Sequence, residues 1–497
     1  MLRGMRSLSL ALGGLYLIIA MSLQSAPRQP NVLLICVDDL KPLLGCYGQS
    51  LVKSPNMDRL SSRGVLFQKA YCNQAVCAPS RNSLMTGMRP GTIGIYDLGT
   101  NFRLAVPRAV TMAEAFKNAG YTTEALGKIF HVGHGNQEDP ASWTVAHWRP
   151  STPMYVVQSN MPPSQPKKGK TKKKKAPADP RGRAVECADV ADSAYADGQV
   201  ADEAIRRLQT RKESGHPFFL AVGFLKPHLP FVAPKKYWDL YKREQFEPYP
   251  NQEPPVGAPE FAPTTWGELR NYSDIPDTGP LSAGQQRELI HGYYAAVSYT
   301  DAQIGRVLDE LERLGLAQDT VVVLWGDHGW HLGDHGMWCK HTNYEEAARI
   351  PLIICVPGLE THGDRSSSLV ESVDVYPTLC ELAGIQPPPG LDGKSVVPVL
   401  RNPTKENKPA VMHFYPRNVK DKGQLIGRAV RTSRYRLVEW KAPGEKPESA
   451  VLELYDYEED PGETRNLAKS RPEVVRELRA ILARHPEAKP QVSRPAS

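Results

Sequence analysis

The chain contains four uninterrupted apolar runs of strand length, separated by polar turns and by longer stretches with helical periodicity. Short apolar runs without alternation are typical of strands that are buried on both faces, as in a parallel sheet. We therefore predict buried parallel strands at residues 32–37, 218–222, 320–325 and 352–356.

Between these runs, apolar residues recur every three to four positions, which predicts amphipathic helices. The longest helix is predicted over residues 284–314, with shorter ones over 201–208 and 374–382, the last ending near Gly384. Strands that alternate with helices indicate an α/β fold, in which a mostly parallel sheet is flanked by helices on both faces.

The pattern changes after the Pro-Pro-Pro-Gly sequence at residues 387–390. Alternating segments at 434–440 and 451–457 predict antiparallel strands, and residues 472–482 predict a last helix. We therefore expect a large α/β domain over residues 27–400 and a smaller C-terminal α+β domain over residues 401–497, which carries an antiparallel sheet.

The first 26 residues have the features of an export signal. Arg3 and Arg6 precede an apolar run at residues 8–20, and small residues follow at a plausible cleavage site. The run is short for a membrane span, and no later segment is long and apolar enough to cross a bilayer. We expect an exported protein without a membrane span after signal removal: periplasmic or secreted, and lysosomal only if the source is an animal.

Composition and charge narrow the class of protein. Of the 497 residues, 41% are hydrophobic and 23% are charged, so the chain is not wholly disordered. The formal net charge is +7, and residues 166–177 contain seven lysines, so 7 − 7 leaves a net charge of zero elsewhere. This distribution argues against a nucleic-acid-binding face and predicts a lysine-rich surface loop at about 160–180. A tether to a sulfated or phosphorylated polymer remains an alternative role for the loop.

Other features concern loops and cysteines. Residues 135–185 and 240–282 are rich in proline, asparagine and charge, which predicts two long surface excursions. The eight cysteines lack the spacing of a disulfide framework, so few disulfides or none are expected.

Two strand ends carry residues that can bind a metal. Asp38 and Asp39 follow the first predicted strand, and Asp327 and His328 follow the third. Ligands gather at the carboxyl ends of parallel strands, and adjacent carboxylates repel each other unless a cation offsets their charge. Oxygen-rich coordination favours calcium or magnesium over zinc. The alternatives are a simple turn at Asp38-Asp39 and a merely orienting role for His328.

A third site signal is the sequence Cys-Ala-Pro-Ser-Arg at residues 77–81. Pro79 suits the first position of a helix, with Cys77 just before it. A helix N-terminus favours anions, and Arg81 adds a planar cation. A structural or low-pKa cysteine at a helix start is the plainer alternative.

The eleven-residue pattern Cys-x-Pro-Ser-Arg-x-x-x-x-Thr-Gly at residues 77–87 resembles the signature of type I sulfatases, a family of the alkaline phosphatase superfamily. The resemblance extends over nearly the whole chain after the signal segment, and within the family it is strongest to the iduronate-2-sulfatase group. The segments that carry it are residues 31–39, 127–131, 224–230, 326–333 and 338–343.

The resemblance implies a set of roles for matching residues. Cys77 would be converted to formylglycine by a formylglycine-generating or sulfatase-maturing enzyme. Arg81, Lys128 and His131 would hold its hydrate, and His228 would protonate the leaving alcohol. The sulfate would be bound by Lys128, His228 and Lys340. The implied calcium ligands are Asp38, Asp39, Cys77, Asp327 and His328.

The physics of these residue types fits those roles. A sulfate ester is an anion, so cations must surround the sulfur before an anion can attack it. A sugar alkoxide is a poor leaving group, and histidine is a suitable general acid. Taken singly, Lys128, His228 and Lys340 could be ordinary surface or loop residues; together, in the family's order, they indicate catalysis.

The implied activity is hydrolysis of O-sulfate esters in a sulfated oligosaccharide or polysaccharide, on uronic acids or related sugars. Two alternatives remain open: a formylglycine-dependent phosphonate monoester or phosphodiester hydrolase, and a non-catalytic glycan-binding protein if Cys77 is unmodified. His413 and Arg417 could contact a sugar carboxylate, although a structural role in the small domain is the plainer expectation. Cys187 is alone in its excursion, so a loop disulfide of the relatives is not expected here.

Overall fold

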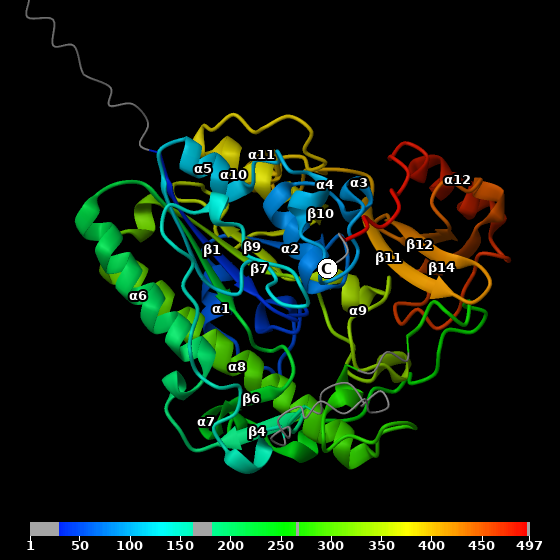
Figure 1. Ribbon diagram of the computed structural model, residues 1–497, viewed down its shortest axis with the longest axis horizontal. Helices are drawn as coiled ribbons and strands as arrows, with labels where there is room; N and C mark the ends of the chain where they lie inside the picture. Colours follow the sequence, from blue (N-terminus) through cyan, green and yellow to red (C-terminus); the bar gives the residue numbers. More distant parts are fainter. Residues whose placement is uncertain (1–28, 163–180, 265–267, 495–497) are drawn as a thin grey trace, which may run out of the picture.

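The computed structural model describes residues 29–162, 181–264 and 268–494 of the chain. The predicted export signal and most of the lysine-rich loop lie outside these ranges. Within the described residues, a central eight-stranded sheet is flanked by helices on both faces, and a second, antiparallel sheet lies beside it (Figure 1).

The strands of the central sheet are β1 (Asn31–Val37), β2 (Val65–Tyr71), β3 (Thr122–Gly127), β5 (Phe218–Phe224), β7 (Thr320–Gly326), β8 (Arg349–Ile350), β9 (Leu352–Cys355) and β10 (Arg365–Glu371). Their spatial order is β10–β2–β9–β7–β1–β5–β3, with β8 paired to β2. Strands β4 (Val185–Ala188) and β6 (Phe231–Pro234) form a separate parallel pair.

The helices are α1 (Pro55–Ser61), α2 (Cys77–Thr86), α3 (Pro90–Ile93), α4 (Phe102–Ala105), α5 (Met112–Asn118), α6 (Ala196–Ser214), α7 (Lys235–Trp238), α8 (Ala283–Arg313), α9 (Glu345–Ala348), α10 (Val375–Ala383), α11 (Val397–Arg401) and α12 (Pro472–Leu482). In Figure 1, α6 and α8 run along one face of the central sheet, and α5, α10 and α11 cover the other.

Strand β1 shows why the sheet is buried on both sides. Leu33, Ile35 and Val37 pack into the core shared with α6 and α8, whereas the alternate residues pack into the core shared with α5 and α10. A strand with apolar neighbours on both faces needs an unbroken apolar sequence. This confirms the predicted α/β class and the strands expected at 32–37, 218–222 and 320–325.

The fourth predicted strand exists, but its predicted parallel direction is wrong. Strand β9 is antiparallel to both β7 and β2. The chain between β7 and β9 stays at the edge where β7 ends, and its one α-helix, α9, has only four residues. Without a crossover connection to the far edge, the next strand must run back in the opposite direction.

The predicted helices are present with small shifts. Helix α8 was expected at 284–314, α12 at 472–482 and α10 at 374–382, and each agrees with the structure to within a residue at either end. Helix α10 ends at Gly384, which adopts a left-handed conformation with φ 67°. Helix α6 is longer than predicted at both ends: its start contains the buried residues Asp197, Gly198 and Val200, and its end, residues 209–214, is polar and mostly exposed.

The C-terminal sheet contains β11 (Val411–Val419), β12 (Gly423–Arg431), β13 (Tyr435–Lys441) and β14 (Val451–Asp456), all antiparallel to their neighbours. This confirms the predicted antiparallel sheet. One face of the sheet packs against α12, and the other packs against Val76 and Ala262 of the larger part. Val76 immediately precedes the signature cysteine, so the small sheet supports the start of α2.

Two further observations concern membranes and cysteines. Among the described residues, none of the helices combines the length and the hydropathy that a bilayer span requires.

All eight cysteines are unpaired thiols in the structure, and seven of them are buried, Cys187 being exposed.

Candidate active site

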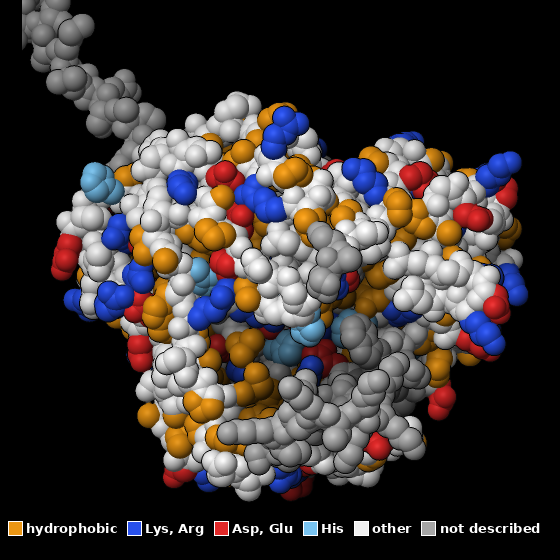
Figure 2. Space-filling view, in the orientation of Figure 1, with side chains coloured by type: hydrophobic (Ala, Val, Ile, Leu, Met, Phe, Trp, Pro, Cys, Tyr) orange, Lys and Arg blue, Asp and Glu red, His pale blue; other side chains and the backbone are white. Residues whose placement is uncertain are grey.

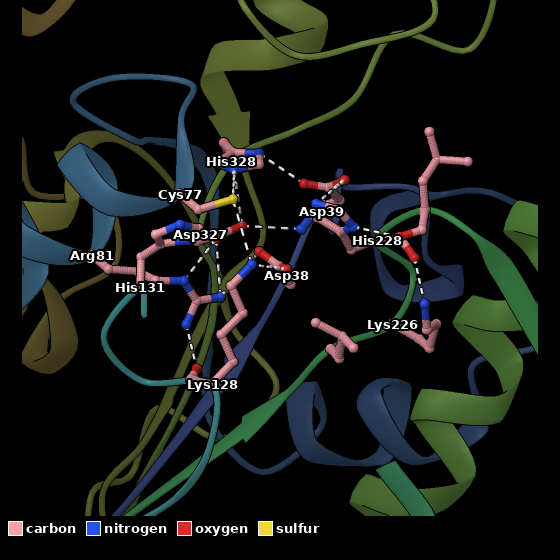
Figure 3. Close-up of polar contacts among 12 residues, drawn as sticks. Asp38, Asp39, Cys77, Arg81, Lys128, His131, Lys226, His228, Asp327 and His328 are labelled. Carbon is pink, nitrogen blue, oxygen red and sulfur yellow. Dashed lines mark hydrogen bonds and ion pairs between the residues drawn. The ribbon is translucent and has the colours of Figure 1, made fainter. Parts of the chain in front are cut away.

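Four neighbouring strands of the central sheet, β7, β1, β5 and β3, run parallel and end at one edge. The candidate residues at these ends are Asp327 and His328 after β7, Asp38 and Asp39 after β1, His228 after β5 and Lys128 after β3 (Figure 3). The sheet topology therefore collects side chains from distant parts of the sequence. Figure 2 shows a hollow on this face of the molecule in which histidine, acidic and basic side chains gather.

Helix α2 brings the signature cysteine to this edge. Cys77 is the first residue of the helix, after Val76 as N-cap, and no side chain caps the helix start. Pro79 is the third helical residue, so the prediction that it opens the helix is wrong by two positions. The free N–H groups of the first turn are compatible with the predicted anion site.

Arg81 is completely buried and ties three strand ends together. Its Nε donates to Asp327 Oδ2 at 2.9 Å, and its other nitrogens donate to Asp38 Oδ1 at 3.2 Å and to the carbonyl of Lys128. A guanidinium with these partners is fully engaged by protein groups. Arg81 thus holds two of the candidate metal ligands in place.

A buried group of four residues can hold a metal ion. Asp38, Asp39, Cys77 and His328 each offer one ligand atom, and these atoms all lie within 4.8 Å of one another. Asp327, the fifth predicted ligand, is adjacent: its Oδ1 lies 3.5 Å from His328 Nε2 and accepts the N–H of Asp39 at 3.0 Å. The structure thus brings all five predicted ligands together.

The pKa values of Asp38, Asp39 and Asp327 are all shifted by burial and by neighbouring charges. Burial raises the pKa of Asp327 to about 8, with a further contribution from Asp38. Burial also raises the pKa of Asp39, against the effect of nearby cations. For Asp38 the balance is reversed, since Lys128 and other cations outweigh burial and lower its pKa well below the usual value. A divalent cation with hard-oxygen preference fits this donor set.

The Cys77 sulfur is surrounded by cations. Its Sγ lies 3.5 Å from Lys128 Nζ and 3.4 Å from His328 Nε2. Burial and Asp38 raise the pKa of the thiol, but Lys128, Lys340 and His328 outweigh them and lower it well below its ordinary value. Lys128 also forms an ion pair with Asp38. An anion at the position of Cys77 is therefore strongly stabilised.

Lys340 is a buried lysine next to Asp39. Its Nζ lies 3.1 Å from Asp39 Oδ1 and 3.0 Å from Glu268 Oε2, and it is 5.0 Å from the centre of the Trp330 ring. Asp39 and Glu268 raise the pKa of Lys340 against the effect of burial, so its charge is retained.

His228 faces the same carboxylates. Its Nε2 lies 3.2 Å from Glu268 Oε1 and 4.0 Å from Asp39 Oδ2, and its Nδ1 donates to the carbonyl of Leu229 at 2.6 Å. Burial lowers the pKa of His228, but Asp39 chiefly outweighs it and the pKa rises to about 10. Because a carbonyl only accepts, the proton that His228 can release is the one on Nε2.

His131 lies at the border of the site, where it contacts another histidine, His134. It lies near Arg81 and Cys77 in Figure 3, and its Nε2 is 3.2 Å from Nδ1 of His134, with the two rings stacked at 5.4 Å. His131 therefore borders the site together with His134, which the sequence analysis did not single out.

Besides His134, two residues of the site were missed in the sequence. Glu268 joins His228 to Lys340, and it comes from the 240–282 excursion, where no motif marks it. Lys226 lies in the quoted motif, but no role was assigned to it. Its buried Nζ donates to the carbonyls of His228 and Pro230, both at 2.7 Å. Asp197 accepts its backbone N–H at 2.8 Å, which clamps this loop to α6.

The buried residues that follow Asp327 and His328 in the sequence support the loop that carries Lys340. His331 hydrogen-bonds to Asp334 on one side and to Thr342 Oγ1, at 2.8 Å, on the other. His335 lies 3.4 Å from the side-chain nitrogen of Asn251. His331, Asp334 and His335 are all buried.

The C-terminal sheet contributes two structural contacts. Arg417 donates to the carbonyls of Phe261 and Ala262 and, at 2.6 Å, to that of His341. His413 is buried and its Nδ1 hydrogen-bonds to Asn343 Oδ1 at 2.7 Å. These contacts support the structural role that was the plainer expectation for both residues.

Comparison with known proteins identifies the family. The Sulfatase family model matches residues 30–385, and the model described as N-sulphoglucosamine sulphohydrolase, C-terminal, matches residues 333–487. Iduronate 2-sulfatase from Homo sapiens is 37% identical over 434 residues, covering 80% of this chain and 76% of the relative. Choline-sulfatase from Rhizobium meliloti is 30% identical over 466 residues, covering 89% and 83%.

Solved structures share the fold. A protein in complex with its substrate D-glucosamine-2-N,6-O-disulfate superposes with a TM-score of 0.71 at 23% identity, covering 92% of this chain and 97% of its own. A phosphonate monoester hydrolase from Silicibacter pomeroyi gives a TM-score of 0.74 at 23% identity, covering 92% and 95%. The signature at residues 77–87, the converging strand ends and the match over residues 30–385 lead to one conclusion: the chain belongs to the type I sulfatases and is a sulfuric ester hydrolase.

Proposed function

We propose that this sulfatase removes O-sulfate groups from sulfated sugars, in the manner of an iduronate 2-sulfatase, with uronate 2-O-sulfate as the preferred ester. The proposal is supported by the 37% identity to human iduronate 2-sulfatase over 80% of the chain. The observation that carries it is the position of Cys77: at the start of α2, beside a carboxylate cluster, with Lys128 and His328 within 3.5 Å of its sulfur.

Calcium is the proposed metal, held by Asp38, Asp39, Asp327, His328 and the modified Cys77. The donor set fits a hard divalent cation, because three buried carboxylates stand close together and burial raises the pKa of two of them. A calcium ion in this place would withdraw charge from the sulfate oxygens.

The proposed nucleophile is formylglycine made from Cys77. As a hydrate it would supply one hydroxyl to attack sulfur and a second through which sulfate is later released. Lys128 is suited to bind sulfate oxygens because its ammonium lies beside Cys77, and Lys340 adds a second ammonium next to Asp39. These cations would stabilise the charge that builds on the sulfate in the transition state.

His228 is the proposed general acid. Its Nδ1 is engaged by the carbonyl of Leu229, so Nε2 is the nitrogen that can give a proton to the leaving sugar oxygen. Its elevated pKa, about 10, keeps the imidazole protonated at neutral pH. Lys226 would hold the loop on which His228 lies, through the two carbonyls that it binds.

The proposal includes two biological expectations. The export signal expected at residues 1–26 would direct the enzyme out of the cytoplasm, where it would meet a sulfated oligosaccharide or polysaccharide. A formylglycine-generating or sulfatase-maturing enzyme of the host would act on Cys77 first. The lysine-rich loop at about 160–180 remains compatible with attachment to an anionic polymer.

The test is turnover of a panel of defined sulfated disaccharides, together with mass spectrometry of the peptide that contains Cys77. We expect a mass that corresponds to the aldehyde, and fastest desulfation of 2-O-sulfated uronates. Cys77→Ala should abolish turnover and leave the fold intact, whereas Cys187→Ala, at the exposed cysteine, should keep full activity. Turnover that survives in Cys77→Ala would refute the assignment.

The same assays separate the alternatives. A phosphonate monoester or phosphodiester hydrolase would cleave an aryl phosphonate or phosphodiester faster than an aryl sulfate; this rival is kept because phosphonate monoester hydrolases share the fold. A non-catalytic glycan-binding protein would show an unmodified Cys77 thiol and no turnover of any ester.

A further inference from the structure

The residues assigned so far account for one anionic group of a sulfated uronate, its sulfate. Such a sugar carries a second anion, the carboxylate, on the same ring. The sugar ring that is released carries both the oxygen protonated by His228 and the carboxylate. A binding site that selects uronates therefore needs a further cation near His228. This inference rests on the proposed function and concerns what recognises that carboxylate.

Arg181 is a cation in this position. Its NH1 lies 3.8 Å from Glu268 Oε1, the same oxygen that lies 3.2 Å from His228 Nε2. Two contacts of 3.8 and 3.2 Å that share one atom place the two nitrogens at most 7.0 Å apart. Glu268 lies between the two side chains, so a sugar would lie across them: the 2-oxygen and the carboxylate of one pyranose ring are on opposite sides of the ring and can each meet one of the two donors.

The Arg181 guanidinium is held in place from one side. Its carbon lies 5.3 Å from the centre of the Tyr272 ring, and NH1 donates to the Tyr272 hydroxyl at 3.2 Å. The backbone is fixed as well, since Arg181 donates its N–H to the carbonyl of Asn271 at 3.1 Å. Tyr272 itself is buried. An arginine stacked on a fixed ring loses little freedom when it binds a carboxylate with its planar fork.

Glu268 does not fully neutralise Arg181. Its two oxygens are engaged by His228 at 3.2 Å and by Lys340 at 3.0 Å, and Arg181 is farther away, beyond hydrogen-bond distance. About 40% of the Arg181 side chain is accessible to solvent. The one carboxylate is therefore shared among three cations, and Arg181 is the most exposed of them.

The charge of Arg181 is also felt on the Cys77 side of the hollow. Burial and His131 lower the pKa of His134, and Arg181 lowers it further. His134 stacks on His131, which borders Cys77. Arg181 thus lies within electrostatic reach of both the general acid and the histidine pair near the nucleophile.

We propose that Arg181, fixed against Tyr272, binds the carboxylate of the uronic acid whose sulfate is cleaved, and thereby selects uronates over uncharged sugars. A charged hydrogen bond of this kind changes affinity by about ten- to a hundredfold. Arg183, two residues further on, pairs with Asp274 at 3.2 Å and provides a matched control arginine.

The experiment compares Arg181→Gln and Arg183→Gln with the wild-type enzyme on three substrates. These are a 2-O-sulfated uronate disaccharide, the same disaccharide with its carboxyl group reduced to an alcohol, and 4-nitrophenyl sulfate. We expect Arg181→Gln to lower kcat/KM on the uronate by about ten- to a hundredfold and to change the other two less than threefold. Arg183→Gln should match the wild type on all three.

The wild-type enzyme alone also tests the proposal, so a folding defect in a variant would not decide it. We expect the wild type to prefer the uronate over its carboxyl-reduced form by a similar factor. Equal rates on the two disaccharides, or an equal loss in Arg181→Gln on both, would overturn the carboxylate site while leaving the sulfatase function in place. If the wild type cleaves 4-nitrophenyl sulfate and neither disaccharide, the proposed uronate function itself fails.

Discussion

Glu345 connects the two sheets and offers a quantitative test of the electrostatics. It lies at the start of α9, and its carboxylate accepts from Arg436 at 2.6 Å, from Arg431 at 3.2 Å and from the Tyr71 hydroxyl at 2.8 Å. Arg431 and Arg436 belong to the C-terminal sheet, whereas Tyr71 ends a strand of the central sheet. Replacing Glu345 by glutamine keeps the shape of the side chain and removes its charge.

The magnitude follows from the pKa. Burial raises the pKa of Glu345, but Arg431 and Arg436 outweigh it and lower the pKa from 4.5 to about 2. A group with a lowered pKa stabilises the folded state above its unfolded pKa, and the contribution is lost as the pH falls toward the folded value. The difference corresponds to about 3 kcal/mol at pH 7, and to about half of that at pH 3.

The assay is equilibrium urea unfolding of the wild type and Glu345→Gln between pH 3 and pH 7. We expect the wild type to be more stable by about 3 kcal/mol at neutral pH, and the gap to narrow steadily below pH 4.5 because protonated glutamate resembles glutamine. Glu448→Gln, at an exposed position of the same part of the chain, is the control and should differ little from the wild type. A gap of constant size at every pH would refute the reasoning.

Three further predictions concern catalysis. His228→Ala should slow sugar sulfates at least a hundredfold more than 4-nitrophenyl sulfate, whose leaving group needs no proton; equal losses would contradict the general-acid role. Lys226→Met should show the same selectivity more weakly, because it loosens the His228 loop, whereas Lys408→Met, at a buried lysine paired with Glu371, should affect both substrates alike. If the proposed calcium is bound, treatment with a chelator should lower both activity and Tm, and added calcium should restore both; an unchanged Tm would argue against a bound metal.

In the central sheet, the strands that the sequence predicts have apolar neighbours on both faces, although β2, which also packs into both cores, was not predicted. Strands β3 and β10 escaped prediction because they carry buried polar residues, whose burial depends on partners elsewhere. In β3, Glu124 is buried only because Arg207 and Arg211 of α6 pair with it. No local sequence pattern predicts the ion pairs of Glu124 with these arginines, since α6 lies about 80 residues away in the sequence.

The residues of the candidate site also fall into those that the sequence predicts and those that only tertiary contacts reveal. The signature cysteine and the carboxylates at strand ends are visible in the sequence, because their spacing from strands and from a helix start is local. Glu268 and Arg181 are not, since only the folded chain brings Glu268 to His228 and Arg181 to Glu268. Arg417 likewise supports the Lys340 loop from the C-terminal sheet, 76 residues beyond His341.

The amino-acid sequence by itself determined the class of fold, the family and the inventory of charged groups, because these follow from hydrophobic periodicity and from one contiguous signature. The tertiary structure decided the reversed direction of β9, the clamp that Arg81 forms on two carboxylates, and the neighbours of His228. The physical reason is the distance in sequence over which each property is set. Periodicity is local and indicates which face of one segment packs against the core. The ionisation and orientation of a buried charge instead depend on every chain segment that packs around it.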